Sequence, residues 1–520
     1  MTDLNIKTLA DIPSRQAEVK PDSIALEFED TRVSYAELDS RSNQVANAFV
    51  ADGVPTQTNI ALLDRNAETF FYVLFGAAKA NLCMVTVNFR LTAGEVSYIL
   101  EDSDAEYLFV SQEFLPIARE CKARLDRVQK IVVLDGEGEQ EGETGLWTWM
   151  NSQPGTAPVD RIPTTEDRAV QMYTSGTTGH PKGVMLTHAC MVCAAEEGIS
   201  VWPVMHEPDA AVLATMPLFH IAAANLCLAG LFAGGRAVIL KEAVPDVVAR
   251  VLAESRIRIV PLPPALIHAI IRLPDIHSYD LSLLDTLLIA GSGIAVELLK
   301  DAQEVLDCGF ALSYGMTECC GGITYLSPKD CVHDAGKLLA SAGRAFGNNR
   351  VRIVDTNRQP LPTGEIGEIA CRSDRLMKGY WHRPEASEEA VDGEWYFSGD
   401  AGYLDEDGYL YVVDRIKDMV VSGGENIYPV EIENELLKHP AVSDVAIIGI
   451  PDEKWGESLL ANVILEPGAE VTGEQLVDFL RGSLAGYKIP RRYEFVDAFP
   501  RNATGKVLKR EMRASWQPAA

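Results

Sequence analysis

The sequence predicts an α/β fold: a large N-terminal domain of layered α/β subdomains, residues 1–413, followed by a small α+β domain, residues 414–520. Three observations lead to this prediction. At 520 residues the chain exceeds what one hydrophobic core usually supports. Up to about residue 410, amphipathic helical patterns alternate with short β-rich runs, which is typical of parallel strands covered by helices. Around residues 400–414 the pattern changes to acidic turns, followed by a β-like run and a Gly-Gly turn.

Short apolar runs mark the expected strands of the large domain. The clearest are IVVLD at 131–135, AVIL at 237–240 and TLLIA at 286–290. Residues 136–159 are rich in Gly, Glu, Pro and Thr, so we expect an exposed connection there. Residues 221–240 form the most apolar run, but an asparagine, three glycines and an arginine interrupt it. This composition predicts a core segment and no transmembrane helix.

The small domain shows its own alternation of patterns. We expect helices and strands in the following order: a helix at 430–438, strands at 442–450 and 459–465, a helix at 474–484 and a final strand at 493–496.

The charge balance excludes some partners. The chain carries 46 Lys and Arg against 75 Asp and Glu, a formal net charge of −29, which repels nucleic acids and anionic membranes. From Arg481 onward the balance reverses, with nine basic residues against three acidic ones. A basic end can serve an anionic ligand or form an ordinary solvated surface, and composition leaves both readings open.

Cysteine usage and the N-terminal residues favour the cytoplasm. The ten cysteines are scattered and lack the Cys/His spacing typical of zinc sites, and residues 1–16 lack the basic and apolar pattern of a signal peptide. The neighbouring Cys319 and Cys320 are expected to be buried free thiols. The sequence leaves room for a homodimer.

The clearest local motif is YTSGTTGHPKG at 173–183, which follows a β-like run. Its hydroxyls, glycines and single lysine suit a loop that surrounds phosphate oxygens with backbone N–H groups, side-chain hydroxyls and one cation. The motif does not fit GxxxxGK[ST], so it is not a Walker loop.

This motif resembles one found in the superfamily of adenylate-forming enzymes, which includes acyl-CoA synthetases, luciferases of the firefly type and peptide-synthetase adenylation domains. The resemblance covers nearly the whole chain and rests on five further motifs in the same order. They are PLFH (217–220), YGMTE (314–318), YFSGD (396–400), DRIKDMVVSGGENIYPVEIE (414–433) and PRNATGKVLKR (500–510).

The resemblance implies a site for ATP and Mg²⁺. Tyr314 would stack on the purine, Thr317 would contact phosphate, Glu318 would be the Mg²⁺ ligand, and Asp400 would accept hydrogen bonds from the ribose hydroxyls. The remaining nucleotide-binding positions implied in this way are Thr174, Ser175, Gly176, Thr177, Thr178, Gly179, Lys182, Gly315 and Arg415.

In the small domain the resemblance implies three further roles. Lys417 would be the hinge of a mobile C-terminal domain, and Gly423 and Gly424 would line a tunnel for the pantetheine arm of coenzyme A. Lys506 would approach the carboxylate and the α-phosphate during adenylation.

The acyl-binding pocket is expected around two segments. His220 stands where amino-acid-activating relatives carry an aspartate, which disfavours an amino acid as the substrate. We expect His220 to be a catalytic residue that gates the pocket or packs beside the substrate carboxylate, and a purely structural core histidine is the alternative. Ala222, Ala223 and Ala224 after it, and the segment Gly291, Ser292 and Gly293, have small side chains that would leave room for a bulky or long apolar acid.

Together these features predict an AMP-forming acyl-CoA ligase that uses ATP, Mg²⁺ and coenzyme A and acts on a medium- or long-chain fatty acid. An aryl-CoA ligase of the cinnamate or benzoate type and a free-standing enzyme that loads an acyl carrier protein are the alternatives. A luciferase-like oxygenase and a non-catalytic binding protein also remain open. The latter is disfavoured because Lys182, Glu318, Asp400, Arg415 and Lys506 are all present.

Overall fold

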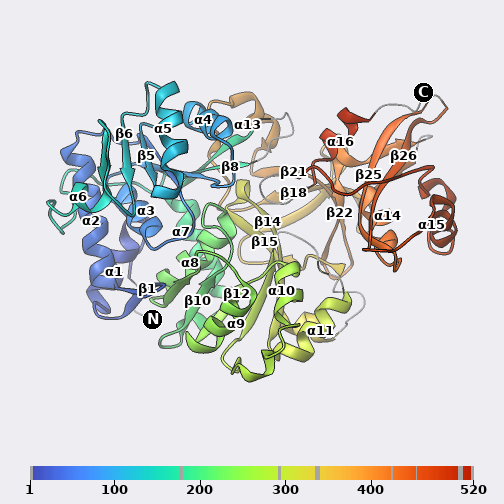
Figure 1. The fold of residues 1–520 in the computed structure, drawn as a ribbon, viewed down its shortest axis with the longest axis horizontal. Coiled ribbons are helices and arrows are strands. Elements are labelled where there is room, and N and C mark those ends of the chain that lie inside the picture. The colour runs from blue at the N-terminus through green and yellow to red at the C-terminus, as the bar shows by residue number, and fades with distance from the viewer. Residues whose placement is uncertain are drawn as a thin grey trace. The chain divides into compact units, whose positions relative to one another are not determined.

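The computed structural model describes residues 4–174, 180–290, 294, 296–333, 340–422, 425–452, 454–501 and 507–516. The chain divides into two compact units (Figure 1). Unit 1 comprises Met1–Val351 and Cys371–Tyr396, and unit 2 comprises Arg352–Ala370 and Phe397–Ala520. The expected boundary between residues 413 and 414 lies within unit 2, and as the boundary of a moving domain it stays a prediction.

Unit 1 contains an eight-stranded sheet in the order β19-β9-β8-β4-β3-β5-β6-β7, in which the β8/β9 and β9/β19 pairs are antiparallel and the other pairs are parallel. Helices α4 and α5 cover one face, where their apolar side chains join those of β3 to β6 in one core. The strands are β3 (Asn59–Leu63), β4 (Cys83–Val87), β5 (Tyr107–Val110), β6 (Lys130–Val133), β7 (Glu143–Gly145), β8 (Arg168–Thr174), β9 (Lys182–Thr187) and β19 (Gly379–Tyr380). The helices of this region are α2 (Tyr35–Ala51), α3 (Thr69–Lys79), α4 (Ala93–Asp102), α5 (Leu115–Arg124), α6 (Leu146–Met150) and α13 (Pro384–Ala390).

A second sheet of unit 1 has nine strands in the order β16-β15-β14-β13-β12-β10-β11-β1-β2. Its central strands are parallel, and the β1/β2, β14/β15 and β15/β16 pairs are antiparallel. The strands are β1 (Ile24–Phe28), β2 (Thr31–Ser34), β10 (Ala211–Ala214), β11 (Arg236–Ile239), β12 (Ile257–Pro261), β13 (Thr286–Ala290), β14 (Gly309–Met316), β15 (Gly321–Leu326) and β16 (Arg344–Ala345). The accompanying helices are α1 (Asp11–Val19), α7 (His188–Val201), α8 (Ile221–Phe232), α9 (Pro245–Glu254), α10 (Pro264–Ile270), α11 (Val296–Leu306) and α12 (Pro328–His333).

A five-stranded sheet in the order β17-β18-β21-β20, in which β22 pairs with β21, lies mostly in unit 2. Unit 2 also contains a second five-stranded sheet. The order of the second is β24-β23-β26-β25, with β27 paired to β26. The strands of the two sheets are β17 (Arg350–Val354), β18 (Gly367–Arg372), β20 (Val391–Asp392), β21 (Trp395–Leu404), β22 (Leu410–Arg415), β23 (Val420–Ser422), β24 (Glu425–Ile427), β25 (Val442–Asp452), β26 (Gly456–Leu465) and β27 (Arg492–Phe495). Of these, β20 and one end each of β17, β18 and β21 belong to unit 1. The helices are α14 (Pro429–Leu436), α15 (Gly473–Leu480) and α16 (Lys509–Ser515).

These elements confirm the predicted fold class and the order of helices and strands in the small domain. The apolar run 221–240 is a core segment, as predicted, because it forms the buried helix α8 and strand β11. In the described part of the chain, every helix is too short or too polar to cross a membrane. All ten cysteines are free, and Cys319 and Cys320 are fully buried, as expected.

The prediction for residues 136–159 was wrong in part. Strand β7 joins the sheet here, and helix α6 buries Leu146, Trp149 and Met150. The ring of Trp149 packs edge-on against Phe49 at 4.9 Å between centroids, and its indole N–H donates to Asp52 at 2.8 Å. Five consecutive residues, LWTWM, anchor a segment that its flanking glycines and glutamates make look like an exposed loop.

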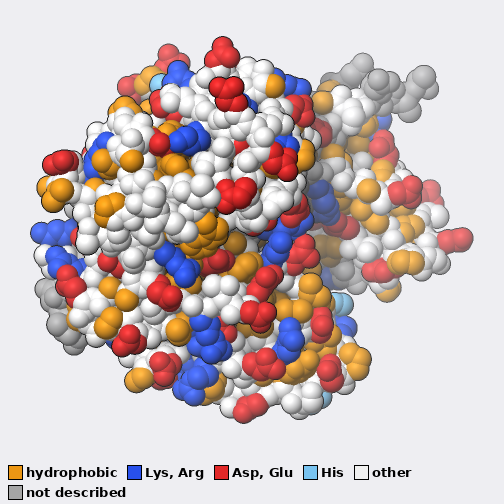
Figure 2. Space-filling model, turned by 60° about the vertical axis from the view of Figure 1, so that its left-hand side comes forward, with side chains coloured by type: hydrophobic (Ala, Val, Ile, Leu, Met, Phe, Trp, Pro, Cys, Tyr) orange, Lys and Arg blue, Asp and Glu red, His pale blue; other side chains and the backbone are white. Residues whose placement is uncertain are grey.

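The basic excess after Arg481 is largely neutralised within unit 2. Ion pairs join Lys488 to Glu431, Lys509 to Glu433 and Arg513 to Asp418 at 2.7, 2.7 and 2.8 Å. Both side chains of the Lys509–Glu433 pair are mostly buried. On the face of the molecule in Figure 2, acidic and basic side chains are intermixed.

Candidate active site

The motif YTSGTTGHPKG, which is predicted to bind phosphate, begins on strand β8 and ends on strand β9, and these two strands are antiparallel. Strand β8 ends at Thr174 and β9 begins at Lys182, and the register places these two residues opposite each other. Side chains of directly opposed residues share one face of a sheet, so the hydroxyl and the ammonium group flank the base of the loop together. Ser175, Gly176, Thr177, Thr178 and Gly179 lie outside the described residues.

The Glu318 carboxylate lies beside this base. It is only 8% exposed, in a short 3₁₀ helix at the end of β14, and Oε1 accepts hydrogen bonds from the Tyr380 hydroxyl at 3.0 Å and the Thr174 hydroxyl at 3.3 Å. The Nζ atom of Lys182 lies 4.9 Å from the centroid of the Tyr380 ring. Lys182 and Glu318, which are far apart in the sequence, thus both contact Tyr380, the lysine at the ring and the carboxylate at the hydroxyl.

Tyr380 was not among the residues picked out by sequence. It belongs to β19, which pairs with β9 and places Tyr380 opposite Val184. Burial and then the Glu318 charge raise the pKa of Tyr380 far above its ordinary value. The phenol is therefore protonated at neutral pH and remains a donor to the carboxylate.

A second group of side chains hydrogen-bonds to residues on both sides of the segment that is predicted to bind phosphate. The Asp102 carboxylate, at the end of α4, accepts from the Tyr173 hydroxyl at 2.8 Å and from Arg383 Nη2 at 2.6 Å. The Tyr98 hydroxyl donates to the carbonyl of Pro181 at 3.2 Å. Sequence reasoning missed Tyr98, Asp102 and Arg383 because no local motif marks them.

Residues 314–317 continue from strand β14 into the turn that carries Glu318. Tyr314 and Thr317 are half-buried and Gly315 is exposed. A Cβ atom on Gly315 would come within 2.1 Å of the Gly321 carbonyl oxygen, so glycine at this position permits β15 to approach β14. The motif therefore has a packing reason for its glycine beside any contact with nucleotide.

His220 lies at the N-terminus of α8, immediately after the PLF segment. Burial and the neighbouring Arg90 charge lower its pKa to about 4, so the imidazole is neutral at pH 7. Of the alanines that follow, Ala222 is half-buried, whereas Ala223 and Ala224 are buried. Of the three alanines, only Ala222 therefore has a substantially accessible side chain. Gly291, Ser292 and Gly293 lie outside the described residues.

In unit 2, Asp400 and Arg415 face each other across strands β21 and β22. The carboxylate Oδ1 lies 2.7 Å from the Arg415 Nε, and Asp400 is buried. The backbone N–H of Asp400 donates to the Ser398 hydroxyl at 3.0 Å, which in turn donates to the carbonyl of Ile369 at 2.7 Å. The carboxylate predicted to bind ribose is thus fixed by β-sheet pairing and by an ion pair.

The expected hinge lies just beyond this pair. Lys417 is in a short 3₁₀ helix, Ile416–Asp418, and burial lowers its pKa. Before it, Asp414 accepts from the backbone N–H of Val430 at 3.0 Å, which ties β22 to the start of α14. Gly423, Gly424 and Lys506 lie outside the described residues, and their roles stay predictions.

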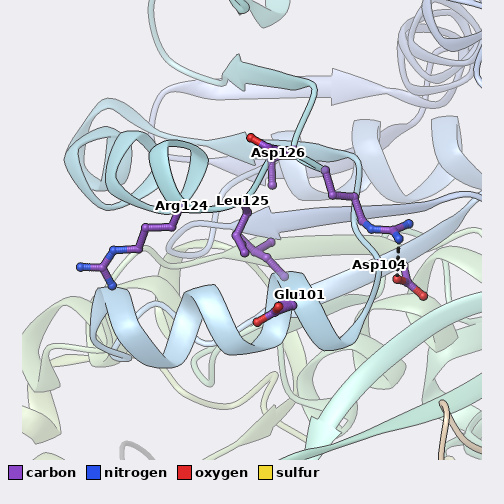
Figure 3. A pocket seen from close by; sticks show the side chains of 8 residues that line it. Glu101, Asp104, Arg124, Leu125 and Asp126 are labelled. Carbon is purple, nitrogen blue, oxygen red and sulfur yellow. Dashed lines mark ion pairs between the residues drawn. The ribbon is translucent and has the colours of Figure 1, made fainter.

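A cavity shown in Figure 3 lies apart from these groups. It is lined by Leu100, Glu101, Asp104 and residues 124–128, and none of the predicted site residues borders it. Asp104 forms an ion pair with Arg127 at 3.3 Å across this cavity.

Known proteins resemble the chain along nearly its entire length. A fatty acid–[acyl-carrier-protein] ligase from Streptomyces coeruleorubidus is 36% identical over 512 residues, which cover 98% of this chain and 96% of that protein. A feruloyl-CoA synthase from an Amycolatopsis species is 38% identical and covers 96% of this chain and 97% of its own. The crystal structure of an anthranilate CoA ligase in complex with anthranoyl-AMP superposes with a TM-score of 0.87 at 30% identity, covering 98% and 97% of the two chains.

The sequence pattern of the AMP-binding enzyme family matches residues 13–381, and that of the AMP-binding enzyme C-terminal domain matches residues 431–506. The first match alone spans more than half of the chain and includes the phosphate loop, Glu318 and Tyr380. The chain therefore belongs to the AMP-binding enzyme family.

Proposed function

We propose that the protein is an AMP-forming acyl-CoA ligase, which joins a carboxylic acid to coenzyme A through an acyl-adenylate and releases AMP and diphosphate. One observation carries this proposal. At one end of the predicted phosphate-binding segment, the Thr174 hydroxyl donates to the Glu318 carboxylate. At its other end, Lys182 lies over the ring of Tyr380, whose hydroxyl donates to the same carboxylate. Such a grouping suits a triphosphate whose negative charge is balanced by a lysine on one side and a metal held by a carboxylate on the other.

The chemistry explains why such a site is needed. A carboxylate is a poor acyl donor because oxide would have to leave, and attack on the α-phosphorus of ATP converts it into a mixed anhydride with AMP as the leaving group. Both reactants are anions, so the protein must offset their repulsion and align them. Lys182 is proposed to bind the phosphates, and Lys506 is proposed to serve the carboxylate and the α-phosphate.

The donor set fits Mg²⁺. The Glu318 carboxylate is a hard oxygen ligand, and one or two carboxylates with substrate phosphates and waters suffice for this ion. The Tyr380 and Thr174 hydroxyls hold one carboxylate oxygen in a fixed direction. Mg²⁺ bound there would neutralise charge on the departing diphosphate. His220, neutral at pH 7, can hydrogen-bond the acid without adding charge.

For the second half-reaction we propose that the C-terminal domain rotates about Lys417, withdraws Lys506 and presents the glycines 423 and 424 to the pantetheine arm. Such a motion gates the reaction, because one site cannot hold the adenylating lysine and the thiol tunnel at once. Asp400 and Arg415 precede the hinge and are proposed to keep the ribose bound in both states.

We propose a medium- or long-chain fatty acid as the substrate. The absence of an aspartate after the PLF segment and the small Ala222 beside His220 support an apolar acid. The similarity to a fatty acid–[acyl-carrier-protein] ligase agrees with this class of acid, while those to a feruloyl-CoA synthase and an anthranilate CoA ligase keep aryl acids as the alternative. The first relative also keeps an acyl carrier protein as the alternative acceptor.

The test measures the release of AMP and diphosphate from ATP and Mg²⁺ in the presence of fatty, aryl and polycyclic acids. Either coenzyme A or a holo acyl carrier protein is supplied as the acceptor, and thioester formation is followed by mass spectrometry. We expect acid-dependent AMP release, with thioester only when coenzyme A is present, and we expect Glu318→Gln to abolish both. Adenylate without acyl-CoA but with acyl-carrier thioester would replace the acceptor. Oxygen-dependent consumption of the adenylate would indicate an oxygenase, and no acid-dependent release would refute the proposal.

We further propose a cytoplasmic homodimer. Ten free cysteines, most of them buried, support a reducing compartment. Light scattering coupled to size-exclusion chromatography tests the assembly.

A further inference from the structure

A buried ion pair lies directly behind the turn that carries Glu318. Arg375 is 2% exposed, and its Nε lies 2.7 Å from the Glu197 carboxylate on helix α7. Arginine is almost never this deeply buried unless it is paired and fully hydrogen-bonded. Neither residue belongs to a motif singled out by sequence.

The two Nη atoms of the Arg375 guanidinium group donate hydrogen bonds to backbone carbonyls of residues 319–322. Nη1 donates to the carbonyls of Cys319 and Cys320 at 3.3 and 3.0 Å, and Nη2 donates to the carbonyl of Gly322 at 2.5 Å. These carbonyls belong to the residues that immediately follow Glu318. One planar cation therefore holds the exit of the turn at three points.

This turn needs such support. Cys320 adopts φ of +52°, in the left-handed region that a residue with a Cβ atom rarely occupies, and Gly321 adopts φ of +110°. The Cys320 carbonyl also accepts from the Asn225 side chain at 2.8 Å. Without partners for its carbonyls, the turn would relax toward a more favourable backbone conformation and carry Glu318 with it.

The segment that supplies Arg375 also contacts Glu318 directly. The Met377 N–H donates to the Glu318 carbonyl at 2.8 Å, and the Tyr380 hydroxyl donates to its carboxylate. Residues 375–380 thus hold the backbone of Glu318, its carboxylate and the turn that follows it. Glu197 in turn accepts from the Asn349 side chain at 3.0 Å and from the Asn348 N–H at 3.1 Å, so it anchors the arginine to the rest of unit 1.

We propose that Arg375, held by Glu197, is a positioning residue for the adenylation step: it fixes the turn 319–322 and thereby directs the Glu318 carboxylate toward the metal–triphosphate. The inference rests on the function proposed above. It assigns to the pair an effect on adenylation and on nucleotide binding, and none on transfer of the acyl group from a preformed adenylate.

The test uses the full-length double variant Arg375→Met/Glu197→Gln, which removes both charges and so leaves no unpaired ion in the core. The matched control is Arg236→Met/Glu27→Gln, which removes another mostly buried ion pair of unit 1, at 3.3 Å between β11 and β1. Three quantities are measured: the two half-reactions separately, affinity for a non-hydrolysable ATP analogue with Mg²⁺ by calorimetry without acid, and hydrogen exchange of the backbone amides at 316–323.

We expect the double variant to lose about tenfold or more in adenylation and to need a higher Mg²⁺ concentration, since charge-assisted hydrogen bonds of this kind are lost. Nucleotide affinity should fall, and the amides at 316–323 should exchange about tenfold faster. Thioester formation from supplied acyl-adenylate should stay within about twofold of the parent protein. The control should match the parent in every readout.

Equal losses in both half-reactions, or unchanged exchange at 316–323, would overturn the positioning role. If the parent protein releases no AMP with any acid, the proposed function fails, while exchange and nucleotide affinity still decide the inference. If the double variant does not fold, Arg375→Lys replaces it. This change keeps a cation for Glu197 but cannot reach three carbonyls, and nucleotide affinity and exchange rates equal to those of the parent would overturn the proposal.

Discussion

Replacing Tyr380 by phenylalanine removes the hydroxyl that hydrogen-bonds to the Glu318 carboxylate and to the Tyr396 hydroxyl in the candidate site. The hydroxyl donates to the Glu318 carboxylate at 3.0 Å in a position where the tyrosine is only 7% exposed, while the ring lies beside Lys182. Phenylalanine keeps the ring and its contact with the lysine. A hydrogen bond to a charged group contributes about 1.5–3 kcal/mol, and about 1.4 kcal/mol corresponds to a factor of ten. We therefore expect adenylation to fall roughly 10- to 100-fold.

The assay is acid-dependent exchange of diphosphate into ATP at several Mg²⁺ concentrations, compared with thioester formation from supplied acyl-adenylate. Only the first should fall, because the hydroxyl acts through the carboxylate that is proposed to hold the metal. Tyr325→Phe, which removes a hydroxyl from β15, is the matched control and should leave both reactions unchanged. Adenylation within about twofold of the parent, or a parallel loss of both reactions, would refute the assignment of Glu318.

The remaining predictions concern other parts of the chain. Lys506→Ala should abolish adenylate formation and leave transfer from supplied acyl-adenylate intact, and equal loss in the two assays would remove its assignment. Lys417→Pro, which fixes φ and removes a backbone donor, should impair thioester formation more than adenylation, and an unaffected second step would argue against the hinge. Burial lowers the pKa of His188 from 6.5 to about 4, so the unfolded chain binds more protons between these values and stability falls as the pH falls through this range. His188→Asn retains an acceptor for the Leu9 N–H and should make the unfolding temperature less sensitive to pH between 6.5 and 4, whereas an unchanged slope would contradict the assignment.

Local patterns predicted much of the fold. The runs at 131–135, 237–240 and 286–290 are β6, β11 and β13 with shifts of at most two residues at either end, because β-branched and apolar runs bounded by turns carry their own signal. The segment 136–159 was misread because its buried part is only one turn of helix, too short for a periodic pattern to appear against the polar residues around it.

The candidate site shows the same division. Thr174, Lys182 and Glu318 could be predicted because they stand in continuous motifs. Tyr380 and Arg375 could not, since their importance arises only when β19 pairs with β9 and the preceding segment packs behind the turn after Glu318. Ion pairing of the basic C-terminal region was equally hidden, because acids such as Glu433 that neutralise it lie far away in the sequence.

Strand β22 has a practical consequence for anyone who wishes to exchange C-terminal domains among members of this family. A junction after residue 413 would cut β22 two residues before its end and graft a foreign residue into the position of Arg415, the partner of Asp400. A junction placed after Asp418 would transplant the domain with strand, ion pair and 3₁₀ helix intact. Only the second junction is certain to keep this chain's own Arg415 opposite Asp400, the carboxylate proposed to bind ribose.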